Sequence, residues 1–285
     1  MNKIRIMIAA VAAMAAVLMC APSVQAADKH TVTVKGSDTL VNLSATWAEA
    51  FMNVNPDIQV SVTGGGSGVG LAALLNGTTD IANASRDVKP AEKKKGLESG
   101  IEVVETNVAL DGIAIIVNQD NPLTEITLDQ LKQIYTGEVN NWQSINGVDL
   151  KIMPISRETS SGTYVFFQEH VLKMKDYTPS ALLMPATSAI VEAVANDKPA
   201  IGYVGLGYAA QAKDRVKVLP VKADEGSPAI EANIETVQAG QYPIARPLHC
   251  YTNGAPAGAI KAFMDFCLSP DGQKMVQDQG FVPLN

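Results

Sequence analysis

The sequence predicts an α/β protein of two lobes, each built on a mostly parallel sheet flanked by helices. Three observations support this prediction. A strand, a turn rich in small and hydroxyl residues, and a helix follow one another repeatedly. The chain has 285 residues, 47% hydrophobic and 18% charged, which is enough for two hydrophobic cores. A second series of strands and helices begins near Asp111, and the chain returns to the first series near residues 243–248.

The N-terminus has the features of a secretory signal peptide over residues 1–26. Lys3 and Arg5 precede an apolar run of about 14 residues, and Val24-Gln25-Ala26 is a small-residue cleavage site. The run is too short for a membrane-spanning helix. We therefore expect export to the periplasm with cleavage near Ala26. A retained membrane anchor and lipid attachment at Cys20 are the two alternatives.

The charge balance restricts the possible partners. The chain carries a net charge of −7, and removal of the leader would take away Lys3 and Arg5 and no acid. So acidic a protein is a poor candidate for nucleic acid or an anionic membrane surface. An anion site would have to be made locally, by hydrogen-bond donors and one or two arginines. A monomer is the expectation for a diffusing carrier.

The cysteines and histidines suggest neither a cofactor nor a metal site. Their spacing is not that of a metal site, because His30, His170 and His249 are scattered along the chain. Export permits a disulfide between Cys250 and Cys267, and two buried free thiols are the alternative.

Residues 27–112 are predicted to form the first of the two segments that make up the first lobe. Strand patterns are followed by turns and then by helical spacing of apolar residues. Strands are expected at 31–34, 58–62 and 80–84, and helices at 40–51, 71–75 and after Pro90.

The second lobe is predicted over residues 113–246, and the chain then returns to the first lobe over 247–285. A long strand at 112–117 is expected to lead across. The further strands are expected at 151–155 and 200–204, and the helices at 128–135, 164–172, 189–195, 259–268 and 271–279.

The glycine-rich turn Gly64–Gly70 invites a nucleotide-binding interpretation, which fails on spacing. A dinucleotide fingerprint, a P-loop and a nucleophile elbow each need a residue that is absent here, such as a lysine where Leu71 stands. The turn is then the start of a helix with Ser67 as a donor. A turn that serves packing alone is the alternative.

The most informative stretch is Ser156–Tyr164, between a predicted strand and a predicted helix. Such a helix start presents unpaired N–H groups and partial positive charge. Ser161 and Thr163 add hydroxyl donors, Gly162 permits close approach of a ligand, and Arg157 supplies a planar cation that suits an oxyanion. The sequence therefore predicts an anion site. The alternative is an ordinary helix cap with a surface arginine.

Two earlier turns offer donors at the same topological place. Ser37 and Thr39 follow the first strand, and Ser85 and Arg86 follow the third. Asp38 would repel an anion unless a proton lay between them, so it would accept the proton of hydrogen phosphate and disfavour sulfate. A helix-capping role is its alternative. For Arg86 the alternative is a surface ion pair with Asp87 or Glu158.

These motifs together resemble the phosphate-binding proteins of ABC importers, the PstS family, from about Thr31 to the C-terminus. The resemblance is carried by Gly36-Ser37-Asp38-Thr39, Gly66-Ser67-Gly68, the stretch from Asp80 through Ser85-Arg86, Arg157 through Ser161-Gly162-Thr163, and the C-terminal Gly280-Phe281-Val282-Pro283.

The resemblance implies a two-lobed periplasmic-binding-protein fold (type II) whose cleft closes on inorganic phosphate, with a membrane permease as partner. It also implies anion contacts from Thr39, Leu40 through its backbone N–H, Ser67, Arg157, Ser161, Gly162 and Thr163. Well-known members of the family have an aspartate where Arg86 stands, so Asp38 is our substitute for the proton-accepting carboxylate.

Two other functions compete with phosphate capture. The same fold could take sulfate, molybdate or tungstate. An exported phosphatase or hydrolase would need a nucleophile with a base, or a metal cluster, and the sequence offers neither at a suitable spacing. We therefore expect a binding protein and not an enzyme.

Overall fold

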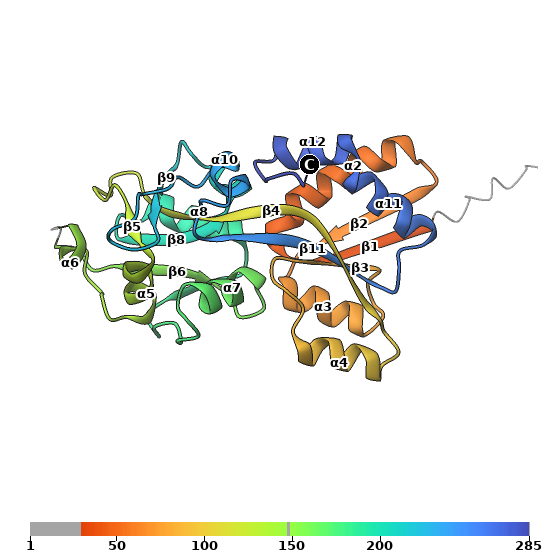
Figure 1. Cartoon of the computed structure of the whole chain (residues 1–285), viewed down its shortest axis with the longest axis horizontal. Coiled ribbons are helices and arrows are strands. Elements are labelled where there is room, and N and C mark those ends of the chain that lie inside the picture. The colour runs from red at the N-terminus through yellow and green to blue at the C-terminus, as the bar shows by residue number, and fades with distance from the viewer. Residues whose placement is uncertain (1–29, 147–148, 285) are drawn as a thin grey trace, which may run out of the picture.

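The computed structural model describes residues 30–146 and 149–284. The predicted signal peptide and Cys20 lie outside the described residues. Within them the chain forms two lobes side by side, joined by the long strands β4 (Val103–Asn118) and β11 (Ala245–Asn253) (Figure 1). No helix in this part of the chain is long and apolar enough to cross a membrane. The predicted two-lobed α/β fold is confirmed.

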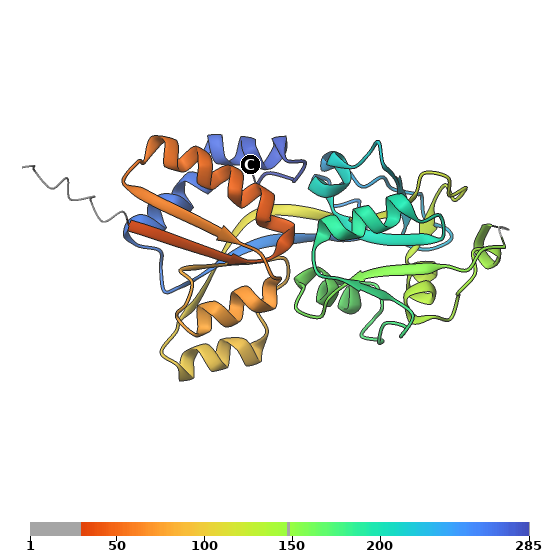
Figure 2. The same cartoon turned by 180° about the vertical axis from the view of Figure 1, so that it is seen from behind.

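The first lobe contains three parallel strands with helices on both faces. Strand β1 (His30–Gly36) lies between β2 (Ile58–Thr63) and β3 (Ile81–Ala84). Helices α2, α11 and α12 cover one face and α3 and α4 the other, as the front and back views show (Figures 1 and 2). The helical segments are η2 (Asp38–Leu40), α2 (Val41–Val54), α3 (Ser67–Leu75), α4 (Pro90–Glu98), α11 (Gly258–Leu268) and α12 (Pro270–Asp278).

Strand alternation divides the first lobe into two cores. Ile81 packs into the core with α2, α11 and α12, whereas its neighbour Ala82 packs into the core with α3. Successive strand side chains point to opposite faces, so β3, which lies between two cores, is buried along its whole length. The sheet is thus packed on both faces, and polar side chains are left at its strand ends.

Strands β4 and β11 cross between the lobes and run antiparallel to their neighbours. β4 pairs with β11 over Val103–Gly112 and then with β8 and β9 over Ile113–Asn118. The sheets are therefore mixed, with parallel pairing in β2-β1-β3 and in β8-β6-β7. The register places Arg246 of β11 directly opposite Asp111 of β4, close to where β4 changes partners.

The second lobe continues the sheet with β8 (Ala200–Gly205), β6 (Met153–Arg157) and β7 (Leu182–Met184), and β9 (Val216–Leu219) pairs with β4. A small sheet joins β5 (Ile126–Thr127) and β10 (Val221–Lys222). The helices are α5 (Leu128–Thr136), α6 (Gln143–Asn146), α7 (Gly162–His170), α8 (Thr187–Asn196), α9 (Leu206–Gln211) and α10 (Ile234–Gln238).

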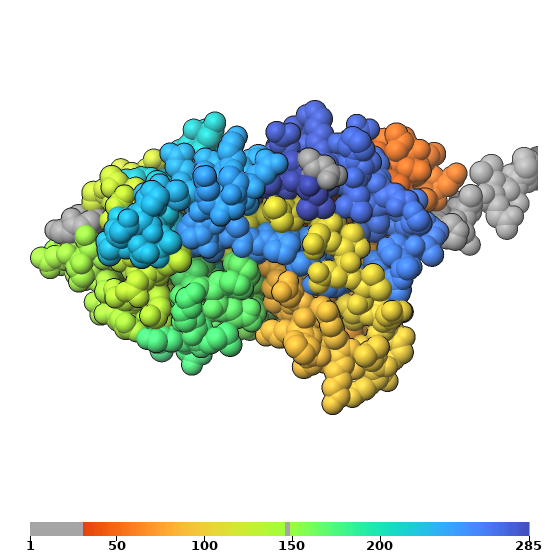
Figure 3. Space-filling view, viewed as in Figure 1, coloured from red at the N-terminus to blue at the C-terminus, as the bar shows by residue number. Residues whose placement is uncertain are grey.

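Strand β4 contributes alternate residues to the two cores of the second lobe. Ile113 and Ile115 face the core that contains α5 and α7, whereas Ala114 and Ile116 face the core of α8 and α9. The space-filling view shows atoms of the α7 region in contact with atoms of the α3 region below β11 (Figure 3). The two lobes thus touch each other at the level of the strand ends.

The two described cysteines do not form a disulfide. Cys250 and Cys267 are buried free thiols in the core of the first lobe, so the bridged alternative is wrong in this structure. The Cys250 thiol donates to the Asn83 side chain at 3.2 Å. Burial raises the pKa of Cys250 to about 12, which makes it an unreactive thiol at neutral pH.

Candidate functional site

Three serines from the first lobe meet where parallel strands end. Ser37 follows β1, Ser67 follows β2 and Ser85 follows β3. The Ser37 hydroxyl donates to Ser85 at 2.8 Å, the Ser67 and Ser85 hydroxyls are 3.3 Å apart, and the backbone N–H of Ser85 donates to Ser67 at 3.0 Å. Each serine is at most 2% exposed. The structure therefore brings together three of the predicted residues in one buried cluster.

The start of α7 brings a second set of donors from the other lobe. The Thr39 and Thr163 hydroxyls are 3.1 Å apart, and the N–H of Gly68 donates to the Ser160 carbonyl at 2.9 Å. A side chain at Gly162 would collide with the hydroxyls of Ser67 and Ser85. Glycine is thus needed here for the approach of the two lobes, and not only for the approach of a ligand, as the sequence suggested.

Two helices begin at this cluster. Helix α3 starts at Ser67, and α7 starts at Gly162 with Ser161 as its N-cap. The Ser161 hydroxyl accepts from the N–H groups of Thr163 at 3.2 Å and Tyr164 at 3.4 Å. The first N–H groups of a helix have no partner within it, and the helix dipole places partial positive charge there. Backbone dipoles therefore make the cluster attractive to an anion.

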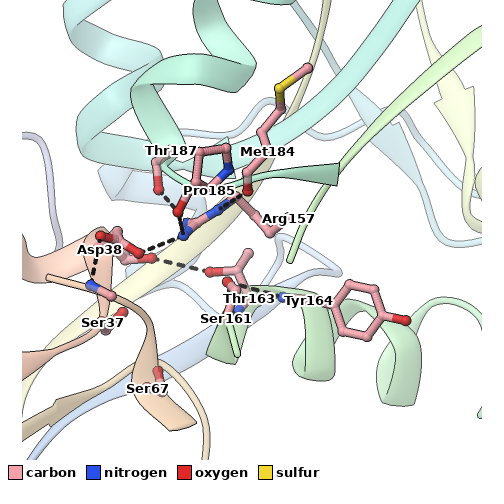
Figure 4. Close-up of polar contacts among 12 residues, drawn as sticks. Ser37, Asp38, Ser67, Arg157, Ser161, Thr163, Tyr164, Met184, Pro185 and Thr187 are labelled. Carbon is pink, nitrogen blue, oxygen red and sulfur yellow. Dashed lines mark hydrogen bonds and ion pairs between the residues drawn. The ribbon is translucent and has the colours of Figure 1, made fainter. Parts of the chain in front are cut away.

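Arg157 is held above the cluster by partners on several sides (Figure 4). Its guanidinium donates to the Asp38 carboxylate at 2.5 Å, the Thr187 hydroxyl at 2.8 Å, the Pro185 carbonyl at 2.9 Å and the Met184 carbonyl at 3.2 Å. The side chain is 2% exposed. Arg157 is therefore fixed in position, and its charge is balanced by a carboxylate from the other lobe.

Asp38 is not the helix cap that was its alternative role. Ser37 occupies the N-cap position of η2, and no side chain caps that helix. One Asp38 oxygen binds Arg157 and the other accepts the N–H of Gly65 at 3.2 Å, while the side chain stays 14% exposed. The carboxylate thus faces the cluster, and proton acceptance from hydrogen phosphate stays a prediction.

Arg86 points away from the serine cluster. Its guanidinium binds both oxygens of Glu92, at 2.8 and 2.9 Å, and the Asp87 carbonyl at 2.7 Å. Both residues lie in the bend after β3, where the Ser85 hydroxyl meets the cluster and the Arg86 guanidinium meets Glu92 in the first turn of α4. Burial is the largest single effect and opposes ionisation of Glu92, but the hydrogen bonds from Arg86 and the Lys89 backbone and the nearby positive charges together hold the pKa of Glu92 below its usual value. The ion-pair alternative thus fits, with Glu92 as partner in place of Asp87 or Glu158.

Leu40 has a different environment from the one that the resemblance implies. Its side chain is fully buried in the core of the first lobe, and its N–H donates to the Ser37 carbonyl at 3.0 Å. In this conformation that N–H is engaged by the tight turn of η2. A contact between Leu40 and an anion stays a prediction.

The sequence analysis missed a buried ion pair behind the threonines. The Arg246 guanidinium donates to Asp111 at 3.0 Å and to the Thr163 hydroxyl at 3.0 Å. Asp111 is fully buried and Arg246 is 3% exposed. Burial raises the pKa of Asp111 and lowers the pKa of Arg246, while their mutual attraction opposes both shifts. The only sign of the pair in the sequence is an acid within the apolar stretch 108–117, which indicates a buried charge without showing its partner.

No group of three His, Cys, Asp or Glu side chains that could hold a metal ion occurs in residues 30–146 and 149–284. The positive charges beside the cluster are those of Arg157 and Arg246, each paired with a carboxylate, and the helix starts add partial positive charge. The donors are mostly neutral hydroxyls and amides. Such a set suits a small anion that is stripped of water, because each buried oxygen of the anion needs a hydrogen-bond donor.

Known proteins are similar in sequence to this chain over most of its length. A PBP superfamily domain matches residues 21–271. The phosphate-binding protein PstS of Staphylococcus saprophyticus is 37% identical over 87% of this chain and 79% of its own. PstS of Bacillus subtilis is 35% identical over 89% of this chain and 80% of its own.

A solved structure agrees with these relatives. A putative phosphate ABC transporter substrate-binding protein from Clostridium perfringens, solved with bound phosphate, superposes with a TM-score of 0.81 at 31% identity. The match covers 90% of this chain and 100% of that one. Identity at this level over nearly the whole described chain goes beyond a shared fold. The chain therefore belongs to the PBP superfamily and, within it, to the PstS family.

Proposed function

We propose that this protein is an extracytoplasmic solute-binding protein that captures inorganic phosphate and delivers it to an ABC importer. The observation that carries the proposal is the convergence of hydroxyls, two helix starts and Arg157 from both lobes in one buried cluster. The named function of the Staphylococcus and Bacillus relatives, and the phosphate in the Clostridium structure, support the same ligand.

The hydrogen-bond donors and acceptors of the Ser161 hydroxyl support an anionic ligand. The Ser161 oxygen accepts two N–H groups, so its own hydrogen remains for an outside acceptor. The other proposed contacts are the remaining polar residues that face the cluster, and Arg86 is left out because Glu92 engages it. The proposed set is Ser37, Asp38, Thr39, Leu40 through its backbone N–H, Ser67, Ser85, Arg157, Ser161, Gly162 and Thr163.

Capture would proceed by closure of the two lobes, 27–112 with 247–285 on one side and 113–246 on the other. The Thr39–Thr163 contact joins the lobes and would form on closure. Closure removes water and strengthens each bond to the anion. This cycle needs no bond making or breaking on the ligand, so we assign a carrier and not an enzyme, working in the periplasm with a membrane permease.

Competition calorimetry tests the ligand. Protein without residues 1–26 is unfolded, dialysed to remove bound anions, refolded and titrated with phosphate, sulfate, molybdate and tungstate. We expect phosphate to bind at least about tenfold more tightly than the other three, a difference of about 1.4 kcal/mol. Tighter binding of another oxyanion would move the assignment to that anion, and turnover of a phosphate ester would revive the hydrolase alternative.

Arg157→Met tests the site. Loss of a charge-assisted hydrogen bond in a closed site costs about 1.5–3 kcal/mol, so phosphate affinity should fall by about 10- to 150-fold. Arg215→Met is the matched control, because Arg215 is 47% exposed and pairs with Glu192 on the surface. Equal phosphate affinity in the Arg157 variant and the control would contradict the proposed site.

A further inference from the structure

We propose that Arg246 is a positioning residue of the phosphate site, which holds the hydroxyls of Thr39 and Thr163 so that one of their hydrogens is directed at the anion. This inference rests on the proposed function. Arg246 would not touch phosphate itself. It would act through the two threonines, which come from different lobes and meet in front of its guanidinium.

Arg246 is held mainly by contacts with residues of the first lobe. It is the second residue of β11 and lies opposite Asp111 in the register of β4. Its Nε and Nη2 donate to one Asp111 oxygen at 3.3 and 3.0 Å, and Nη1 donates to the Ser85 carbonyl at 2.7 Å. Asp111 is fixed in turn by the N–H of Leu206 at 2.9 Å. The guanidinium thus has little freedom to turn.

The remaining contacts of Arg246 lie where the two lobes meet. Nη2 donates to the Thr163 hydroxyl at 3.0 Å and lies 3.5 Å from the Thr39 hydroxyl. The guanidinium also lies over the Phe166 ring, 5.4 Å from its centre. Thr163 and Phe166 both belong to α7, whose first turn forms part of the proposed site. One buried cation therefore links the strand ends of the first lobe to the helix start of the second.

The direction of these hydrogen bonds follows from the chemistry of the groups. A guanidinium only donates, so the Thr163 oxygen must accept from it. Each hydroxyl has one hydrogen, and the 3.1 Å bond between Thr39 and Thr163 uses one of the two. Whichever threonine donates in that bond, the other keeps a hydrogen with no further acceptor in the described part of the chain.

The retained hydrogen is useful only to an acceptor, and phosphate oxygens are acceptors. Because Arg246 occupies a lone pair of Thr163, the hydroxyl pair is biased toward donation. Hydrogen bonds in such a chain also polarise one another, so a charge behind the threonines strengthens the outward bond. Asp111 lowers the free-energy cost of burying Arg246, since its carboxylate balances the guanidinium charge without facing the anion.

A purely structural role for the ion pair is the competing explanation, and a double-mutant cycle separates the two. The paired variant Asp111→Asn/Arg246→Met removes both buried charges at once, so no unpaired charge remains. Phosphate affinity is measured by calorimetry in four proteins: wild type, the paired variant, Thr163→Val, and the paired variant combined with Thr163→Val. Thermal unfolding confirms that each protein is folded at the temperature of titration.

We expect the paired variant to bind phosphate about 10- to 100-fold more weakly than wild type. In the Thr163→Val background the same change should cost less than about threefold, because the hydroxyl through which Arg246 acts is already gone. Equal losses in both backgrounds, or a paired variant within threefold of wild type, would overturn the inference. These outcomes leave phosphate binding by the wild type untouched, whereas a wild type that binds none of the four oxyanions refutes the proposed function as well.

Arg246→Lys is the second variant, for the case in which the paired variant is unfolded. Lysine keeps the charge opposite Asp111 but has no planar fork to reach both the Ser85 carbonyl and Thr163. We expect about a three- to tenfold loss of phosphate affinity that vanishes in the Thr163→Val background. A loss of equal size in both backgrounds, or none at all, would count against the inference.

Discussion

Asp38→Asn is the most direct test of how the site distinguishes phosphate from sulfate. The Asp38 carboxylate has about four lone-pair positions. Arg157 and the N–H of Gly65 occupy two of them, so the side chain can still accept a proton from a ligand. Hydrogen phosphate carries such a proton at neutral pH and sulfate does not. Asparagine keeps the shape but loses both the charge and much of the accepting capacity.

The expected size of the effect follows from two opposing changes. Hydrogen phosphate loses a charge-assisted bond worth about 1.5–3 kcal/mol. Both anions gain from the loss of a like charge, which is worth about 3 kcal/mol for unit charges about 6 Å apart at an effective dielectric constant of ~20. The gain is common to both ligands and largely cancels in the ratio. Phosphate-over-sulfate selectivity should therefore fall by about 10- to 150-fold.

The assay is calorimetric titration with phosphate and sulfate at one neutral pH. Glu158→Gln is the matched control. It also removes one carboxylate, but Glu158 is exposed and only adjoins Arg157 in the sequence. The melting temperature of each variant shows whether the fold is intact, since asparagine cannot serve Arg157 and Gly65 equally well. An unchanged ratio in a folded Asp38→Asn protein would refute the assignment of Asp38 as the proton acceptor.

Three further predictions concern residues outside the anion contacts. Arg86→Met should leave phosphate affinity within about threefold but lower the free energy of unfolding by about 1–3 kcal/mol, because Glu92 loses its partner; a large loss of affinity with normal stability would restore Arg86 to the site. Thiol titration without reductant, on protein that lacks residues 1–26, should detect neither Cys250 nor Cys267 in the native state and both after denaturation. Fewer than two reactive thiols after denaturation would indicate a bridge. Burial lowers the pKa of His249, so the unfolded chain takes up a proton first as the pH falls below about 6.5, and stability is lost there. His249→Gln should flatten the melting temperature between about pH 7 and pH 5 relative to wild type, and an identical slope would contradict this.

Residues that follow strands could be located from the sequence, because strand ends in parallel sheets meet at one edge. Ser37, Ser67 and Ser85 are examples, and their hydroxyls do form one cluster. Sequence spacing says less about side-chain direction. Arg86 was grouped with Ser85, but in the bend after β3 its guanidinium pairs with Glu92 and not with the cluster.

The ion pairs could not be predicted from the sequence, because each joins residues that are far apart along the chain. Arg157 and Asp38 are 119 positions apart, and Arg246 and Asp111 are 135 apart. Their meeting depends on the antiparallel crossing of β4 and β11 and on the approach of α7 to the first lobe. The expectation of mostly parallel sheets gave no reason to place β11 beside β4, so this register was out of reach.

The two ion pairs suggest how an acidic protein can hold an anion and still release it. A buried arginine without a partner would attract phosphate strongly but would be costly in the empty protein. Here Arg157 is paired with Asp38, and Arg246 with Asp111, so each buried arginine charge is balanced by a carboxylate. The attraction for the anion then comes from hydroxyl groups and helix starts that are aligned only when the lobes are together. Because Asp38–Arg157 and Thr39–Thr163 both span the lobes, separation would dismantle the donor set and the arginine position at once. On the proposed function, opening of the lobes would therefore release the ligand without any chemical step.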